Sequence, residues 1–285
     1  MKSLIQSILL ISALFFINSC NTVSTEKGNS QTPDILVETD MGSMVFRLYD
    51  ETPLHRDNFL KLVEDNFYDS ILFHRVIENF MVQAGDPESI GSDPDAELGE
   101  ADLPYKVPAE FSPTLFHKKG VLGAARDGNL EKASSSTQFY IVQGKVYTSD
   151  SLIDFQENRI NEWLAQNRVE KDETNKSLFD QRKELHENYS ESDSLELKSI
   201  NDQIAELVKL DRENTAPYII PKDHREVYKS IGGTPHLDQN YTVFGELVKG
   251  LEVIDKIAEV DTNDKDRPSS DIKIINTKLI ERKEY

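Results

Sequence analysis

One arginine in the first third of the chain lies among aromatic, apolar and amide side chains. Arg75 follows His74, and the next stretch contains Phe80, Met81 and Gln83. A guanidinium stays protonated at physiological pH and carries several N–H donors. In partly dry surroundings, a charge-assisted hydrogen bond from such a donor contributes roughly 1.5–3 kcal/mol. These residues therefore suit a reaction in which a transient hydrogen-bond acceptor is stabilised and no covalent bond is made.

The motifs of common covalent and cofactor-dependent enzymes are absent from the sequence. The 285 residues contain no GxSxG nucleophile elbow, no phosphate-binding P-loop, no HExxH zinc motif and no dinucleotide fingerprint. The one cysteine, Cys20, lies close to the N-terminus, and neither it nor the six histidines have the close spacing of a structural zinc site. The sequence therefore predicts no cofactor, no metal and no internal disulfide.

The residues around Arg75 fall in short stretches that have the pattern of β-strands. Residues 34–50 alternate apolar and polar side chains about a turn at Met41 and Gly42, which predicts an antiparallel hairpin. Residues 53–65 have helical spacing after Pro53, with Thr52 as the expected N-cap. Short apolar runs separated by turn residues follow at 72–77, 80–84, 120–125, 138–143, 242–247 and 272–280. Many short strands with few helices predict a closed barrel or a sandwich.

A long segment with a different periodicity interrupts this pattern. Between Thr148 and Ser230 the apolar spacing becomes about 3.6 residues, which is typical of amphipathic helices. The expected apolar stripes are Leu152, Phe155, Ile160, Trp163 and Leu164, then Leu178, Arg182 and Leu185, then Leu197, Ile200, Ile204, Leu207 and Val208. The segment is too long for an ordinary loop, so we expect an insertion of two or three helices. Trp163 is expected to pack in a core or at a docking surface.

The chain is strongly acidic, with 51 acidic and 32 basic residues and a net charge of −19. Proteins that bind nucleic acid normally show a clustered basic face, so nucleic acid is not an expected partner. Acidic residues occur in the strand-rich part and in the helical part alike. We interpret this charge as serving solubility rather than one specific partner.

The N-terminus has the layout of a signal peptide over residues 1–19, with Lys2 before an apolar run from Leu4 to Ile17. This run is shorter than the ~20 residues that a transmembrane helix needs. The stretch that ends at Cys20 resembles the lipobox of bacterial lipoproteins, in which the cysteine is acylated and begins the mature chain. The alternative is a plain secretory signal with an incidental cysteine.

Residues 20–33 are mostly small and polar, which predicts a flexible tether behind the lipid. We therefore expect this protein in the cell envelope, anchored to a bacterial membrane through Cys20. We expect the protein on the periplasmic side, with its lipid in either leaflet.

Four blocks of sequence, taken together and in this order, resemble the cyclophilin-type peptidyl-prolyl cis-trans isomerases. They are FHRVIENFMVQAGD (73–86), GVLGAAR (120–126), STQFYI (136–141), and PHLD with VFG (235–238 and 243–245). The resemblance covers most of residues 34–147 and 231–285 and leaves 148–230 as a helical insertion. It implies a mainly β fold, an eight-stranded antiparallel β-barrel closed by two helices, at 53–65 and at about 253–258.

The resemblance also implies which residues form the site. Arg75 would be the catalytic residue, and Gln83 would orient it or the substrate carbonyl. Apolar walls for the proline ring would come from Phe80, Met81, Leu237 and Tyr140, the last at a position that usually holds phenylalanine.

Further substrate contacts are implied at the edge of this pocket. The backbone of Ala125 and Arg126 and the side chain of Gln138 would pair with an extended peptide. His236 replaces a tryptophan that many eukaryotic members carry, and Tyr241 falls where those members have histidine. Both are expected to bind substrate.

The chemistry of proline isomerisation agrees with these residues. An X-Pro bond interconverts over a barrier of roughly 18–20 kcal/mol, because amide resonance must be broken. A catalyst needs to favour only the twisted state, in which the prolyl nitrogen becomes pyramidal and accepts a hydrogen bond. The predicted function is isomerisation of X-Pro bonds in unfolded or extended proteins outside the cytoplasm, which assists their folding.

Two alternatives concern the helical insertion. In the first, the protein is a peptide-binding, chaperone-like module in which the insertion holds clients and isomerisation is weak or absent. In the second, the insertion is a docking arm for an assembly partner. An insertion folded across the substrate groove would favour the module.

Overall fold

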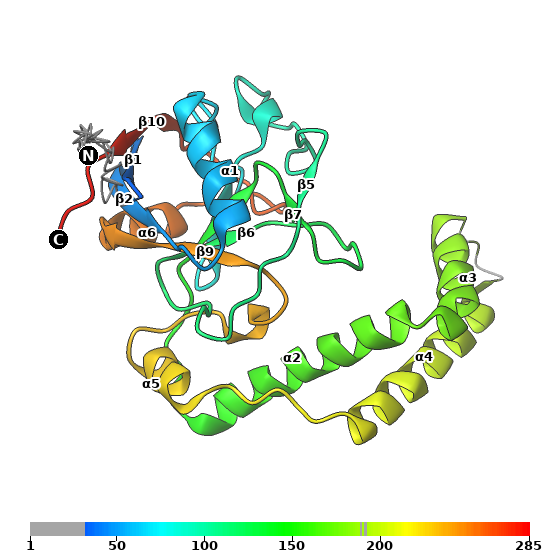
Figure 1. The fold of residues 1–285 in the computed structure, drawn as a ribbon. Helices are drawn as coiled ribbons and strands as arrows, with labels where there is room; N and C mark the ends of the chain where they lie inside the picture. Colours follow the sequence, from blue (N-terminus) through cyan, green and yellow to red (C-terminus); the bar gives the residue numbers. More distant parts are fainter. Residues whose placement is uncertain (1–31, 189, 191–192) are drawn as a thin grey trace, which may run out of the picture. The chain divides into compact units, whose positions relative to one another are not determined.

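The computed structural model describes residues 32–188, 190 and 193–285. The predicted signal peptide, Cys20 and most of the predicted tether lie outside these described residues. One antiparallel sheet has the strand order β10-β1-β2-β9-β6-β8-β4-β3. Figure 1 labels β1, β2, β6, β9 and β10 of this sheet. Its strands are β1 (Asp34–Thr39), β2 (Gly42–Leu48), β3 (Arg75–Ile77), β4 (Met81–Ala84), β6 (Val121–Ala124), β8 (Phe139–Val142), β9 (Val243–Lys249) and β10 (Ile274–Ile280). Strands β5 (Lys106–Val107) and β7 (Ser134–Ser135) form a second, two-stranded sheet.

The large sheet curls because its two edges are joined by the segment that precedes β3. The Ser70 N–H donates to the Ile274 carbonyl at 2.8 Å, and the Phe73 N–H donates to the Ile272 carbonyl at 2.9 Å. Edge strands leave unpaired backbone groups, and closure of this kind satisfies them. The expected fold class, an antiparallel β-barrel with an inserted helical segment, is confirmed.

Two helices pack on this sheet, close to their predicted bounds. Helix α1 (Pro53–Glu64) contacts β9 and β10, and helix α6 (Leu251–Ala258) contacts β2, β3 and β4. The largest core cluster fills the space that they enclose with the sheet, and it includes Phe46, Phe59 and Ile254, each no more than 3% exposed. These apolar contacts hold the strands that carry the site.

The predicted cap of α1 is corrected by the structure. Thr52 occupies the N-cap position, but its side chain makes no hydrogen bond to the helix. The carboxylate of Glu110 accepts instead from the backbone N–H groups of Leu54 and His55, each at 3.0 Å. A carboxylate also complements the positive end of the helix dipole. A residue from another part of the chain therefore takes over the capping role.

The insertion between β8 and β9 contains more helices than expected. Its described residues form four α-helices, namely α2 (Asp150–Lys171), α3 (Lys176–Glu187), α4 (Ser194–Asn214) and α5 (Lys222–Ser230). The expectation of two or three missed α5, because most of its residues are charged or polar and it buries only His224 and Tyr228. Short 3-10 turns occur at Pro87–Ser89, Glu173–Asn175 and Pro235–Leu237.

The buried face of α2 also differs from the predicted stripe. Leu152 and Phe155 are 47% and 61% exposed, whereas Ile153 and Ile160 are buried. Spacings of three and four residues allow either face at the start of the helix, and packing on the Tyr147 and Tyr228 rings selects the one with Ile153.

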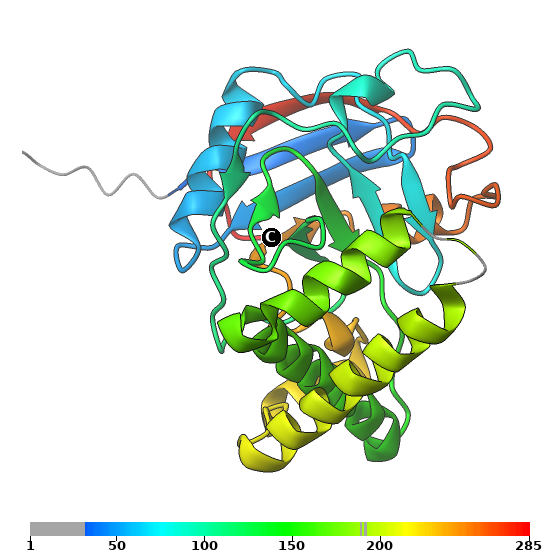
Figure 2. The same cartoon turned by 90° about the vertical axis from the view of Figure 1, so that its right-hand side faces the viewer.

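Helices α2 and α4 lie side by side (Figures 1 and 2) and share a small apolar cluster with α3. This cluster contains Val169, Phe179, Ile200 and Ile204. Across the described part of the chain, every helix is too short or too polar to span a membrane.

Candidate active site

The register of the sheet places three of the predicted site residues in one row with Gly123. Arg75 on β3 pairs with Gln83 on β4, Gln83 pairs with Tyr140 on β8, and Tyr140 pairs with Gly123 on β6. Side chains alternate between the faces of a sheet, so these four residues share one face. The neighbouring row, Val76, Val82, Ile141 and Leu122, belongs to the barrel core. The site therefore lies on the outer face of the barrel.

Nine of the eleven residues predicted to catalyse or bind substrate line one cavity of about 150 Å³ on this face. They are Arg75, Phe80, Met81, Gln83, Ala125, Arg126, Tyr140, Leu237 and Tyr241. Gln138 and His236 do not line it, and they contact residues that do. The cavity wall is mostly apolar and aromatic, with Arg75 and Gln83 as polar groups on one side.

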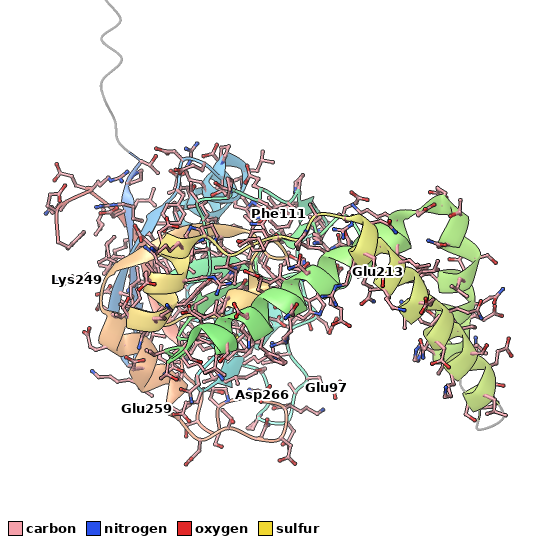
Figure 3. All side chains as sticks on the ribbon, turned by 90° about the horizontal axis from the view of Figure 1, so that it is seen from below. Glu97, Phe111, Glu213, Lys249, Glu259 and Asp266 are labelled. Atoms are coloured by element: carbon pink, nitrogen blue, oxygen red, sulfur yellow. The ribbon has the colours of Figure 1, made fainter. Side chains whose placement is uncertain are left out.

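The Arg75 guanidinium is held from two sides. Its Nη1 lies 3.4 Å from Oε1 of Gln83, and its Nε lies 3.5 Å from Oδ2 of Asp266. Asp266 lies in the loop between α6 and β10, where Figure 3 labels it, and its carbonyl accepts from the Val76 N–H at 2.8 Å. The Arg75 side chain remains 44% exposed. It is thus positioned and still open to a ligand.

A chain of amides fixes Gln83 in turn. Its Nε2 donates to Oε1 of Gln138 at 3.1 Å, and the Gln138 Nε2 donates to the carbonyls of Gly99 and Ala101 at 2.9 Å. The Gln138 side chain was expected to pair with the substrate. In this structure its amide is used to orient Gln83, and through Gln83 it orients Arg75.

The backbone of Ala125 is also engaged within the protein. Its N–H donates to the Gln138 carbonyl at 3.0 Å, and its carbonyl accepts from the Ser135 N–H at 2.8 Å. The predicted backbone pairing of Ala125 and Arg126 with an extended peptide stays a prediction. The side chain of Arg126 stacks on the rim, with its guanidinium carbon 4.5 Å from the centroid of the Tyr241 ring.

A buried hydrogen-bond chain supports the floor of the cavity. The Tyr140 hydroxyl lies 2.8 Å from Nε2 of His117, and Nδ1 of His117 lies 2.8 Å from Oδ1 of Asp238. Asp238 also accepts from the hydroxyl of Tyr228, on α5, at 2.7 Å. Burial raises the pKa of the Tyr140 hydroxyl well above its ordinary value. The hydroxyl that distinguishes Tyr140 from phenylalanine is therefore a neutral partner of His117 and ties the cavity floor to the insertion.

Gly123 leaves room for the Tyr140 ring, and this contact yields a stability prediction. A Cβ at position 123 would lie 2.2 Å from Cζ of Tyr140, so Gly123→Ala forces the ring out of place. Overpacking of this kind costs typically about 1–3 kcal/mol, and we expect a matching fall in the free energy of unfolding together with weaker substrate binding.

Urea unfolding and kcat/KM for a proline peptide would measure both effects of Gly123→Ala. For the stability effect, Gly128→Ala is the matched control, because nothing lies within 4 Å of its added Cβ. Equal stability of the two variants would contradict the assigned contact.

The rim of the cavity carries His236, which contacts residues from two parts of the chain. Its ring stacks on Phe80 with centroids 5.5 Å apart, and the ring of Trp163, from α2, meets it edge-on at 6.2 Å. Trp163 packs against the apolar cluster around Met81 and Leu237. The expectation that Trp163 docks or packs is confirmed, and its place beside the cavity could not be read from its spacing.

Two histidines near the site are neutral at pH 7. Burial lowers the pKa of His74 to about 4, and burial together with the nearby Arg159 lowers the pKa of His236 to about 3. In an unfolded chain a histidine titrates near 6.5. At a pH between the folded and the unfolded pKa, the histidine is protonated in the unfolded chain only, which favours unfolding. The contribution of each neutral histidine to the free energy of unfolding is therefore fully present above about pH 6.5 and is lost as the pH falls towards 4.

We therefore expect the free energy of unfolding to decrease between pH 7 and pH 5, by roughly 1–2 kcal/mol for each of the two histidines. Urea titrations at both pH values would measure this decrease in the free energy of unfolding. In the His74→Leu variant, the decrease should be smaller by the contribution of one histidine. The control is His186→Ala, because His186 on α3 is exposed. An unchanged difference in the His74 variant would contradict the assignment.

Several residues of the site have no signal in the local sequence. Asp266, His117 and Trp163 contact site residues that are far from them in the chain. Asp238 lies within a block that resembles the family, but its part in supporting Tyr140 is visible only in three dimensions. In the described part of the chain, no group of three or more His, Cys, Asp or Glu side chains is arranged to hold a metal ion.

Comparisons with known proteins agree with this geometry. A family model described as "Cyclophilin type peptidyl-prolyl cis-trans isomerase/CLD" matches residues 35–161 and 212–279. A Streptococcus pyogenes protein named "Putative bifunctional phosphatase/peptidyl-prolyl cis-trans isomerase" is 29% identical over 252 residues, which cover 87% of this chain and 39% of that protein. This chain thus spans about two fifths of that relative. A Staphylococcus saprophyticus protein named "Putative peptidyl-prolyl cis-trans isomerase" is 26% identical over 254 residues, which cover 89% of this chain and 94% of the relative.

A solved structure shares the fold. The crystal structure of a Cryptosporidium parvum cyclophilin type peptidyl-prolyl cis-trans isomerase has a TM-score of 0.50 and 16% identity, and the match covers 88% of this chain and 99% of that one. The family model spans the strands of the large sheet and every predicted catalytic and substrate-binding residue, and it omits residues 162–211 of the insertion. The chain belongs to the cyclophilin type peptidyl-prolyl cis-trans isomerase family.

Proposed function

We propose that this protein catalyses the cis–trans isomerisation of X-Pro bonds in unfolded or extended polypeptides. One observation carries the proposal: Arg75 lines the same cavity of about 150 Å³ as Phe80, Met81 and Leu237. Met81 and Leu237 are 2% and 5% exposed, so this wall is dry and suits the apolar proline ring. The guanidinium beside it supplies a hydrogen-bond donor that stays charged.

The reaction needs rotation about one bond and no proton transfer to a side chain. Twisting the X-Pro bond removes amide resonance and makes the prolyl nitrogen pyramidal, so that it accepts a hydrogen bond that the planar ground state does not accept. Arg75 donates this bond while the apolar wall holds the ring, and the rest of the peptide turns. An interaction made only in the twisted state lowers the barrier instead of tightening ground-state binding.

Gln83 and Asp266 act as positioning residues in this scheme. Each lies within about 3.5 Å of the Arg75 guanidinium and restricts its orientation. Orientation before reaction removes part of the entropic cost of reaching the twisted state. Since both leave Arg75 44% exposed, the donor remains available to the substrate.

A protease-coupled or direct spectroscopic assay on a short X-Pro peptide tests the proposal. Uncatalysed isomerisation takes tens to hundreds of seconds, so acceleration by micromolar protein is easily resolved. We expect the cis-to-trans relaxation rate to increase in proportion to the protein concentration. A rate equal to the uncatalysed one at every concentration would overturn the proposal.

A second candidate function is the holding of unfolded clients. It is favoured by a cavity of about 720 Å³ between α2, α4 and the segment after α4, with Ile204, Val208 and Ile219 among its walls. Ile219 is 60% exposed there. If this surface holds clients, Ile219→Asp should reduce the suppression of client aggregation, whereas unchanged suppression would count against this role.

We also propose that the protein acts outside the cytoplasm, held to a bacterial membrane by a lipid at Cys20. The support is the signal-peptide layout of residues 1–19 and the polar stretch behind Cys20. A single acyl chain anchors only marginally, so stable attachment requires more than one. Mass spectrometry of the mature N-terminus should find an acylated cysteine, and Cys20→Ser should release the protein into the soluble fraction. An unmodified N-terminus would exclude the anchor.

A further inference from the structure

A second cleft adjoins the cavity of about 150 Å³ that Arg75 lines, which we call the proline cavity. Helix α2 of the insertion forms one wall of this cleft. The cleft has a volume of about 360 Å³ and lies between α2 and the loop of residues 126–132. Arg126 and Tyr241 line both this cleft and the proline cavity, so the two share a wall. Asn167 on α2 donates to the Leu130 carbonyl at 3.1 Å, which holds the helix against the loop.

Two cations of this cleft have no acidic partner in the part of the chain that the structure describes. The Arg126 guanidinium donates to the carbonyl of Asn240 at 2.9 Å and to that of Asp127 at 2.7 Å. The Lys132 ammonium donates to the Gln239 carbonyl at 3.2 Å and lies 5.7 Å from the centroid of the Phe111 ring, which Figure 3 labels. Neutral oxygens satisfy the donors of these groups but do not balance their charge.

The burial of Lys132 makes this imbalance costly. Lys132 is 7% exposed, and a buried ammonium group is normally paired with an acid. Burial and the neighbouring Arg126, Lys171 and Arg168 lower its pKa to about 8, so it remains mostly charged at pH 7. A buried cation that has no acidic partner among the described residues favours an anionic ligand.

The acidic side chains nearby do not fill this need. The Asp127 carboxylate accepts from the Asn129 N–H at 3.0 Å and pairs with Lys106 at 3.4 Å, while Glu131 pairs with Lys171 at 3.2 Å. Glu170 lines both this cleft and a neighbouring cavity, and it forms no ion pair with Arg126 or Lys132 among the described residues. The end of the cleft near Arg126 and Lys132 is therefore positive.

Trp163 gives the cleft a flat aromatic wall and joins it to the proline site. Its ring lines the cleft and packs edge-on against His236, which stacks on Phe80. A peptide whose proline lies against Phe80 has neighbouring residues within reach of this wall, since each extended residue spans about 3.3 Å. The chain that flanks the proline is therefore long enough to reach the cleft.

We propose that this cleft is a second substrate subsite, supplied by the insertion, that binds an acidic residue flanking the proline. The proposal rests on the proposed isomerase function and names the class of substrate that this function prefers. Arg126 and Lys132 bind the carboxylate, and the Trp163 ring covers the aliphatic part of the same side chain. The helical insertion then acts as a specificity element of the enzyme.

The test uses the full chain and peptides that contain one X-Pro bond and differ at a single flanking residue, Glu, Gln or Lys. The substituted position is moved along both sides of the proline. At the best position we expect kcat/KM for the Glu peptide to exceed that for the Gln peptide by roughly 5- to 10-fold at low salt, and the Lys peptide to be the poorest. A preference of this kind should weaken as salt is added.

Binding is measured separately from catalysis by intrinsic fluorescence, because Trp163 is the only tryptophan of the chain. We expect its emission to change when the Glu peptide binds, with a Kd roughly 5- to 10-fold lower than for the Gln peptide. This readout works even if isomerisation is absent. If the isomerase proposal is wrong, the protein accelerates the isomerisation of no peptide, but the Kd values still follow the charge of the flanking residue.

Lys132→Met is the decisive variant, since it removes a buried charge that has no acidic partner in the described ranges and keeps the length of the side chain. It should lower the Glu-to-Gln ratio towards one without unfolding the protein. Lys278→Met on β10 removes the same charge from an exposed ion pair with Glu38 and should leave the ratio unchanged. On α2, Trp163→Phe should weaken binding of both peptides, whereas Phe155→Ala, at a position 61% exposed, should not. Because Trp163→Phe removes the fluorescent ring, the binding of these two variants is measured by titration calorimetry.

Equal kcat/KM and equal Kd for the Glu and Gln peptides at every flanking position would overturn the subsite. A ratio that persists in the Lys132→Met variant would overturn the assignment to this cleft.

Discussion

Replacement of Arg75 by alanine is expected to lower kcat/KM for an X-Pro peptide by roughly 10- to 150-fold. This range follows from the loss of one charge-assisted hydrogen bond that is made only in the twisted state and is worth roughly 1.5–3 kcal/mol. The cavity walls from Phe80, Met81 and Leu237 do not depend on Arg75, so we expect ground-state binding to change little. Rate measurements over a range of peptide concentrations would separate the two effects.

Two further variants sharpen this prediction. Arg75→Lys keeps the charge but loses the planar fork that Gln83 and Asp266 orient, so it should recover only part of the activity. Arg56→Ala removes an arginine of α1 that pairs with Asp50 and Asp57, away from the cavity, and it should leave kcat/KM unchanged. If Arg75→Ala were as active as Arg56→Ala, the proposed mechanism would fail.

Replacement of Asp238 by alanine is expected to lower the free energy of unfolding by about 3–5 kcal/mol. The carboxylate is 1% exposed and accepts from the His117 backbone N–H at 2.9 Å, from the His117 ring and from the Tyr228 hydroxyl. The substitution leaves these donors buried without an acceptor, and each such group costs about 1–3 kcal/mol. Denaturant unfolding of both proteins would measure the difference.

The matched control for Asp238 is Asp180→Ala on α3. Asp180 forms an exposed pair with Lys176 at 3.6 Å, and such pairs contribute only about 0–1 kcal/mol. Tyr228→Phe should have an intermediate effect, because it removes one donor and leaves Asp238 bonded to His117. A cost for Asp238→Ala no greater than for Asp180→Ala would contradict the role of the buried chain.

The alternation of side chains along the strands predicted which of the site residues share one face of the sheet. Side chains alternate along a strand, so the spacing of Arg75, Met81, Gln83 and Tyr140 predicts which of them share a face once the strands pair. The tertiary structure supplied that pairing. Because these are local patterns in a fixed order along the chain, nine of the eleven predicted residues line one cavity.

In the insertion, local sequence patterns are not sufficient to predict which helix faces are buried or how many helices form. An apolar stripe beginning at Leu152 and one beginning at Ile153 are both compatible with helical spacing, and the contact with Tyr147 and Tyr228 decides between them. Helix α5 has almost no apolar face of its own, and its buried Tyr228 hydroxyl bonds to Asp238 in the barrel. Helix α5 is therefore stabilised by contact with the barrel, whose residues lie outside the helix's own segment.

The sequence by itself predicted the family, an eight-stranded antiparallel β-barrel, nine of the residues that line the cavity beside Arg75, and an inserted helical segment. The tertiary structure decided how those residues are supported and what surrounds them. Glu110 caps α1, Asp266 holds Arg75, His117 bonds to Tyr140, and Trp163 lies on His236. Each pair joins residues distant in the chain, and only folding brings such groups close enough for hydrogen bonds and ring contacts to favour one arrangement.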